Sequence, residues 1–95
     1  NEALRLAPDH TEAWHQRGLL YLDWAQEESA LNDFEAAVRC DGNHLGARLR
    51  IAAIHHKAER FPEALGAWNG VLAIEPEHTV ARRRREECEM ALATI

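Results

Sequence analysis

The chain has 95 residues, of which 46% are hydrophobic and 28% charged, and its formal net charge is −5. A chain of this length folds as one small domain that buries roughly 60 to 65% of its unfolded surface, which leaves no room for a second core. Helix formers such as Ala, Leu, Glu and Arg dominate, and no apolar run reaches the roughly 18 to 20 residues of a membrane span. We therefore expect an all-α, soluble domain without a membrane partner.

Two cysteines, Cys40 and Cys88, lie too far apart for a CxxC motif and are too few for a secreted disulfide framework. They favour a reducing compartment, so we expect a cytoplasmic protein. Residues 1–7 have the apolar pattern of a helix end, but no helix start signal precedes them. We therefore also expect a fragment of a longer protein.

Five helical patterns follow in chain order, separated by short polar breaks, at residues 11–24, 28–40, 45–58, 62–74 and 79–93. Breaks this short predict that successive helices pack antiparallel. Asp9 and Asn43 are the expected N-caps of the first and third helices, and Pro62 suits the first turn of the fourth.

An internal period of 34 residues organises these patterns. The stretches "LRLAPDHTEA" and "LAIEPEHTVA" share their order of apolar, proline, acidic and His-Thr residues, with Pro8 and Pro76 lying 68 positions apart. Histidines mark every step of half that distance, at His10, His44 and His78. Each period contains two helices, so the sequence predicts a helical repeat.

The stretch "WHQRGLLY" at 14–21 resembles the tetratricopeptide repeat (TPR), whose pattern is Trp, Leu-Gly, Tyr, Ala, an aromatic and Pro at fixed spacing. The matching residues of the first repeat are Trp14, Gly18, Tyr21, Ala30 and Phe34, and those of the second are Ile51, Ala52, Ala64, Trp68 and Pro76. The departures are Arg17, Gly42, Arg48 and His55.

The resemblance implies antiparallel helix-turn-helix repeats stacked as a right-handed α-solenoid. Residues 1–95 would form a single TPR-like domain: the end of a preceding B helix at 1–7, repeat one at 11–44, repeat two at 45–78, and a terminal A-type or capping helix at 79–93. The last helix has Glu86 and Glu89 at the slots of Gly18 and Tyr21. Because buried unpartnered carboxylates are costly, we expect this face to meet water. A truncated true repeat is the alternative.

Four consecutive arginines open this last helix, at residues 82–85. Helical i,i+4 spacing predicts three ion pairs, namely Arg82–Glu86, Arg83–Glu87 and Arg85–Glu89, and leaves Arg84 unpaired. Residues 82–89 then carry a net charge of only +1. Since phosphate binding requires uncompensated cations, we expect no nucleic-acid partner.

The A-type helices, residues 11–24, 45–58 and 79–93, hold eight Arg or Lys against five Asp or Glu, whereas the rest of the chain holds three against eleven. In TPR proteins the A helices line a concave groove that binds extended peptides or helices. The family's groove slots correspond here to His15, Leu19, Leu22, Leu49, Arg50, Ala53, His56, Lys57, Arg83 and Arg84. We expect a protein or peptide partner, with an acidic segment as the best match to this basic end; scattered cations on a solvated helix face are the alternative.

One TPR subclass grips acidic chaperone C-terminal tails with a clamp of Lys, Asn and Arg. The slots of that clamp hold His15, Leu19, Arg50, Val80 and Arg84, and only Arg84 matches, so we do not expect a chaperone-tail partner.

Catalysis and metal binding are not expected from the residues. The chain has one serine, Ser29, and one lysine, Lys57, and no glycine-rich phosphate loop, so no cofactor is predicted. His10, His44 and His78 occupy equivalent loops of successive repeats and cannot share one ion. The predicted function is a non-catalytic protein–protein interaction module with a scaffold or adaptor role. The alternatives are a regulatory or targeting segment of a larger enzyme, and a homo-oligomer formed through exposed repeat ends.

Overall fold

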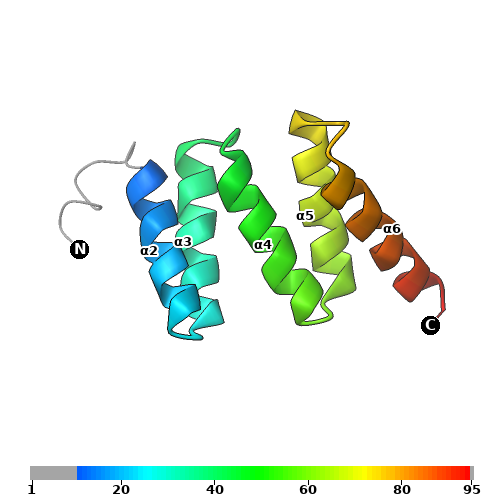
Figure 1. Cartoon of the computed structure of the whole chain (residues 1–95), viewed down its shortest axis with the longest axis horizontal. Helices are drawn as coiled ribbons and strands as arrows, with labels where there is room; N and C mark the ends of the chain where they lie inside the picture. Colours follow the sequence, from blue (N-terminus) through cyan, green and yellow to red (C-terminus); the bar gives the residue numbers. More distant parts are fainter. Residues whose placement is uncertain (1–10, 95) are drawn as a thin grey trace. The chain divides into compact units, whose positions relative to one another are not determined.

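The computed structural model describes residues 11–94, which form five α-helices and no strand. The helices are α2 (Thr11–Asp23), α3 (Glu27–Cys40), α4 (Leu45–Lys57), α5 (Phe61–Ile74) and α6 (Thr79–Ala93) (Figure 1). Each begins and ends within one residue of its predicted range, so the all-α prediction is confirmed. None of them combines the length and the hydropathy that crossing a membrane requires. The helix end predicted at 1–7 and the Asp9 cap lie outside the described residues.

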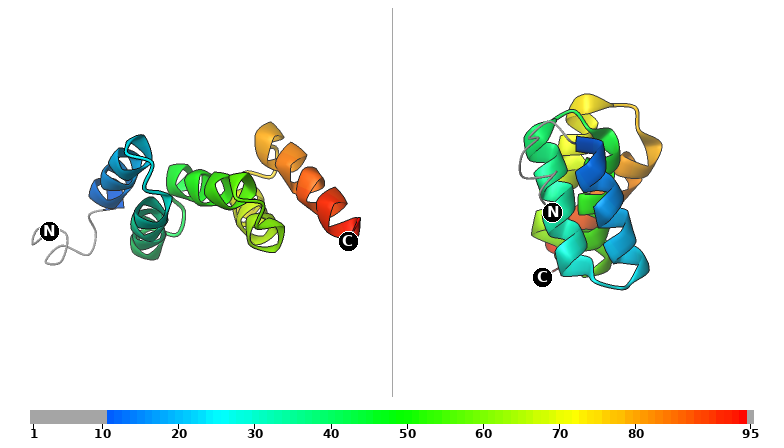
Figure 2. Two further views of the ribbon diagram at one scale, coloured as in Figure 1. Left: turned by 90° about the horizontal axis from the view of Figure 1, so that it is seen from below. Right: turned by 90° about the vertical axis from the view of Figure 1, so that its left-hand side faces the viewer.

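The chain divides into two compact units, unit 1 ending at Ala47 and unit 2 beginning at Arg48. In unit 1, α2 and α3 run antiparallel and side by side, joined by a short turn (Figures 1 and 2). In unit 2, α5 packs against α6. The α2–α3 pair is the helix-turn-helix pair that the sequence predicts for the first repeat, whereas α5 and α6 belong to the second predicted repeat and to the terminal helix.

Helix packing in unit 1 depends on Gly18 facing Phe34. Both residues are buried, and a Cβ atom at position 18 would lie 2.6 Å from the Cε1 atom of Phe34. Any side chain there would push α2 away from α3. The glycine of the repeat pattern thus has a direct steric cause.

Arg17 occupies a slot where TPR proteins have leucine, and an ion pair explains the departure. Its Nε and Nη2 atoms donate to the Asp33 carboxylate at 2.7 and 2.9 Å. The guanidinium also lies over the rings of Trp14 and Tyr21, at 5.2 and 5.7 Å from their centroids. The hydrogen bonds to Asp33 raise the pKa of Arg17, so the pair stays charged.

Helices α2 and α4 are each followed by a residue in the left-handed region of the backbone. Ala25 has a φ of 59° and Glu59, which lies 34 residues later, has a φ of 61°. The next amide in each case donates back to a carbonyl five residues earlier, from Gln26 to Tyr21 and from Arg60 to His55. This is the Schellman arrangement of a helix end, made here without glycine.

The recurring histidines cap helices. His44 Nδ1 accepts a hydrogen bond from the Ala47 amide at 3.0 Å, and His78 Nδ1 accepts one from Ala81 at 3.1 Å. The prediction that Asn43 is the N-cap of α4 was wrong, because the side chain of His44 accepts from the first-turn amide instead, and the Asn43 backbone amide donates to Asp41 Oδ1. His10, the earlier member of the series, lies outside the described residues. Pro62 lies in the first turn of α5, as predicted.

Candidate functional site

Helices α4 and α6 of unit 2 are connected through Glu87. Its Oε1 atom accepts from Arg84 Nη1 at 2.9 Å and lies 3.2 Å from His56 Nε2. The hydrogen bond from Arg84 is the main cause that lowers the pKa of Glu87, with a smaller contribution from His56. The carboxylate therefore ties up two of the residues predicted to bind a partner.

His56 also has a structural role on its other ring nitrogen. Its Nδ1 atom accepts from the indole Nε1–H of the buried Trp68 at 3.3 Å, and the Cys88 thiol lies 3.5 Å from the same nitrogen. Because an indole can only donate, Nδ1 is unprotonated and Nε2–H donates to Glu87. The first repeat has Leu22 and Phe34 at the positions of His56 and Trp68. His56 thus occurs in the repeat in which the indole of Trp68 needs a hydrogen-bond acceptor.

The order Cys88, His56, Glu87 is that of a thiol, a base and a carboxylate, an arrangement that can activate a nucleophile. The surroundings work against this chemistry. Cys88 is fully buried, and burial is the first cause that raises the pKa of its thiol. His56 Nδ1, which would have to take the thiol proton, already accepts from Trp68. The cluster therefore has the properties of a packed core contact.

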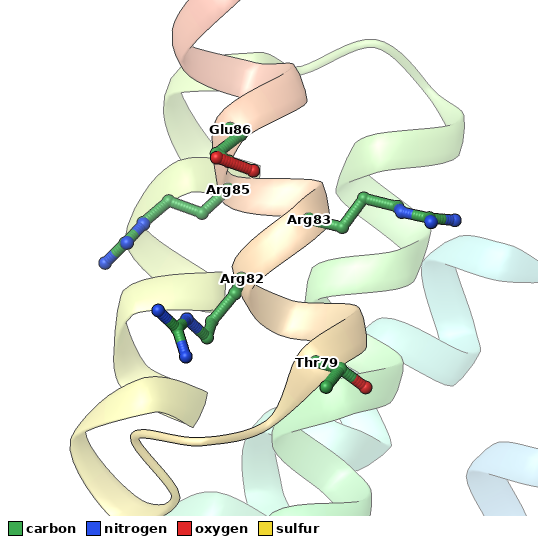
Figure 3. Close-up of a pocket in the computed structure, with 5 residues that line it drawn as sticks. All are labelled: Thr79, Arg82, Arg83, Arg85 and Glu86. Carbon is green, nitrogen blue, oxygen red and sulfur yellow. The ribbon is translucent and has the colours of Figure 1, made fainter.

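The four arginines of α6 have different surroundings, and Figure 3 shows Arg82, Arg83 and Arg85. Arg82 pairs with Glu77 at 3.1 Å and Arg84 pairs with Glu87, so the predictions of an unpaired Arg84 and of an Arg82–Glu86 pair were wrong. Arg85 is half-buried, with its Nε atom out of contact with solvent. Arg83 is exposed and extends to the side of α6 opposite Arg82 and Arg85, and it has no ion-pair partner among residues 11–94.

The i,i+4 rule was misleading here because competing partners lie closer. Glu77, in the loop before α6, accepts a hydrogen bond from Arg82. Arg84 pairs with Glu87, which lies three residues later on the same helix. Glu86 and Glu89 are exposed, as expected for a helix with a polar outer face. On its inner side α6 buries Ala81 and Cys88.

The other residues predicted to bind a partner differ in exposure. Leu19, Leu22 and Leu49 are half-buried, and Arg50, Ala53 and Lys57 are exposed. Arg50, like Arg83, has no ion-pair partner within the described part of the chain. In that part, the side chains of Arg50 and Arg83 are therefore both exposed and uncompensated.

In unit 1, the surroundings of His15 differ from those expected of a residue that lines the partner-binding groove. It packs against Phe34, with ring centroids 5.7 Å apart, and against His44, at 4.8 Å. Its Nδ1 atom faces Glu12, and its Nε2 atom is buried without a hydrogen-bond partner among the described residues. This cluster is not apparent when the loop histidines are compared only with one another. The i,i+3 pair Glu12 and His15, lying about one repeat before His44, was the available signal.

Comparison with known proteins gives a limited but consistent result. No family model matches the chain. A TPR repeat-containing protein of Rhizobium etli is 29% identical over 84 residues, which are 88% of this chain and 41% of that protein. Protein FlbA of Caulobacter vibrioides is 49% identical over 43 residues, which are 45% of this chain and 7% of that protein. The chain thus spans less than half the length of either relative. The first similarity, together with the all-helical fold and the 34-residue period, supports a relation to TPR proteins.

Proposed function

We propose that the chain is a non-catalytic protein–protein interaction module, built as a right-handed TPR-like solenoid, that binds an acidic segment of a partner protein. The binding surface would be the concave groove formed by the first helix of each repeat, α2 and α4, and by α6. In this arrangement the module acts as a scaffold or adaptor. The relation to a TPR repeat-containing protein supports protein partners in general.

The observation that carries the proposal of an acidic partner is the uncompensated charge of Arg50 and Arg83. Both side chains are exposed and lack ion-pair partners within residues 11–94, although the chain as a whole is acidic. Exposed arginines form charge-assisted, bidentate hydrogen bonds with carboxylates, which makes them suitable anchors for Asp or Glu side chains.

The residues that we propose as cationic anchors are fewer than those at the groove positions predicted from the sequence. Arg84 and His56 would contribute only if Glu87 released them, so we propose Arg50 and Arg83 as the principal cations. The apolar part of the groove would consist of Leu19, Leu22, Leu49 and Ala53, with His15 and Lys57 at its edges. These apolar residues, next to the two arginines, suit the binding of an extended segment with acidic residues next to apolar ones.

A peptide-display selection against the immobilised chain tests the proposal. We expect the bound peptides to be enriched in Asp and Glu, and their affinity to fall at least about tenfold in R50E/R83E and with rising salt. R82E is the control for R83E within the double variant, because it makes the same Arg-to-Glu change one residue away but removes only an exposed pair with Glu77. Peptides without acidic enrichment, or an equal loss in R82E, would contradict the proposal.

Two other roles are alternatives to this proposal. The chain spans 41% of the R. etli relative, so it can also serve as a regulatory or targeting segment of a larger enzyme. Self-association through repeat ends would appear as concentration-dependent sedimentation, and no acidic peptide would then be selected. We further propose a cytoplasmic location, on the basis of the free cysteines Cys40 and Cys88.

A further inference from the structure

Three side chains that can ligate a metal meet near the start of α2 in unit 1: Glu12, His15 and His44. Glu12 Oε1 lies 3.2 Å from His15 Nδ1, and Glu12 Oε2 lies 3.3 Å from His44 Nε2. One ligand atom can be chosen from each residue so that all three lie within 4.8 Å of one another. We propose that this cluster binds a divalent transition-metal ion of the Zn²⁺ class.

The cluster is not a packing requirement of the repeat. The residues 34 positions after Glu12, His15 and His44 are Gly46, Leu49 and His78. Only the capping histidine recurs, because both His44 and His78 accept from a helix amide through Nδ1. The acid and the second histidine are therefore additions to the first repeat, and their presence calls for a cause other than the fold.

The Glu12 carboxylate is in a state suited to a metal. Hydrogen bonds, with His15 the largest contributor, lower the pKa of Glu12 from 4.5 to about 2, so its carboxylate is ionised near neutral pH. His15 Nε2 is shielded from water and lacks a hydrogen-bond partner among residues 11–94. A buried ring nitrogen without a partner calls for an explanation, such as a bound water or ion.

The donor set and spacing select the class of ion. Two imidazoles and one carboxylate are typical zinc ligands, whereas Mg²⁺ and Ca²⁺ require oxygen atoms. Zinc–ligand bonds of about 2.0 to 2.1 Å place the ligands of a tetrahedral site about 3.3 Å apart. The three ligand atoms of the cluster lie within 4.8 Å of one another, so they would have to approach by at most about 1.5 Å to bind the ion. Glu12, with 66% of its side chain exposed, leaves room for a water as the fourth ligand.

Metal binding would compete with helix capping at His44. A neutral imidazole that coordinates through Nε2 carries its proton on Nδ1, and that nitrogen accepts from the Ala47 amide here. The ion would therefore displace this hydrogen bond, weakening the site by about tenfold relative to one without the competition.

The test uses the full chain, Zn²⁺ as the probe, and two-dimensional NMR with isothermal titration calorimetry. One equivalent of Zn²⁺ should shift the signals of Glu12, His15 and His44, while Mg²⁺ at the same concentration should not. H15L copies the second repeat, and H44N keeps a good N-cap while it removes the ligand. Each variant should weaken Zn²⁺ binding at least about tenfold. Losing a residue that hydrogen-bonds a metal ligand already costs about that much affinity, and losing the ligand itself should cost no less.

H78N is the matched control, since it makes the same substitution at the equivalent cap of α6 and should leave Zn²⁺ binding unchanged. Circular dichroism confirms that each variant is folded. Three results would overturn the proposal: no saturable binding, equal effects of H44N and H78N, or first shifts at His56 and Cys88 in unit 2.

Discussion

Arg17 and Asp33 form an ion pair in unit 1 that the second repeat lacks, since the equivalent positions there are Ile51 and Ala67. The same fold therefore already supplies an apolar replacement for the pair. Buried ion pairs often contribute little net stability, because desolvation offsets their attraction. The double variant R17I/D33A tests whether this is true here.

The expected magnitudes follow from exposure. R17I leaves the Asp33 carboxylate, which is 3% exposed, without its bidentate partner. Breaking a buried pair costs about 3 to 5 kcal/mol, and because the Arg17 side chain is 34% exposed we expect the lower value, about 3 kcal/mol. D33A should cost about 1.5 kcal/mol, since the guanidinium keeps its aromatic contacts and can reach water. The double variant should lie within about 1 kcal/mol of the natural chain.

Urea denaturation followed by circular dichroism measures these differences, and the double-mutant cycle gives the coupling energy. We expect a coupling of about 3.5 to 5.5 kcal/mol, because the double variant should show little of the sum of the two single losses. Additive losses would refute the reasoning, and so would a double variant as unstable as R17I. Either result would mean that unit 1 does not tolerate the packing of the second repeat.

Three further predictions concern the helix ends, the Trp68 contact and pH. A25G and E59G should each stabilise the chain by about 0.5 to 1 kcal/mol in urea denaturation, because glycine avoids the strain of a side chain at positive φ. H56L should destabilise unit 2 by about 1 to 3 kcal/mol, because the Trp68 indole loses its acceptor in the core, and H56L/W68F should recover most of that loss in the same assay. Glu12, with its pKa lowered from 4.5 to about 2, stabilises unit 1 above about pH 4.5 and loses this effect as the pH falls through about 2; E12Q should flatten that part of a Tm-against-pH profile.

Each of these predictions has a control. A53G places glycine at an exposed position inside α4 and should destabilise by about 1 kcal/mol, the ordinary cost of glycine in a helix. The same loss in A25G or E59G would show that those turns hold no strain. An H56L/W68F variant as unstable as H56L alone would contradict the indole argument. An unchanged pH profile in E12Q would assign the acid sensitivity to other carboxylates.

The sequence was sufficient to predict the helices, because the 34-residue period and the polar breaks place their ends to within one residue. It was less informative about caps. A histidine N-cap is uncommon, so Asn43 looked the better candidate although His44 makes the bond. Propensities rank residue types, whereas the actual cap depends on which side chain meets the free amide.

The candidate site was harder to predict, because its ion pairs depend on three-dimensional competition. Helical spacing alone could not show that Glu87 accepts from both Arg84 and His56, since the second contact comes from another helix. The same limitation hid the Glu12 cluster, in which a loop histidine meets the start of an earlier helix. Interactions within a helix follow spacing, but those between helices require the packing itself.

Comparing the two repeats separates residues that maintain the fold from residues that are free to bind. Where a polar residue replaces an apolar one for structural reasons, its partner changes too: Arg17 occurs with Asp33, and His56 occurs with Trp68. Arg83 has no such partner among the described residues, although its equivalents in the earlier repeats are His15 and Leu49. An exposed cation without an ion-pair partner contributes little through its charge to the stability of its own domain. Its charge is therefore available to a ligand, which makes Arg83 a stronger candidate for partner binding than the paired Arg84.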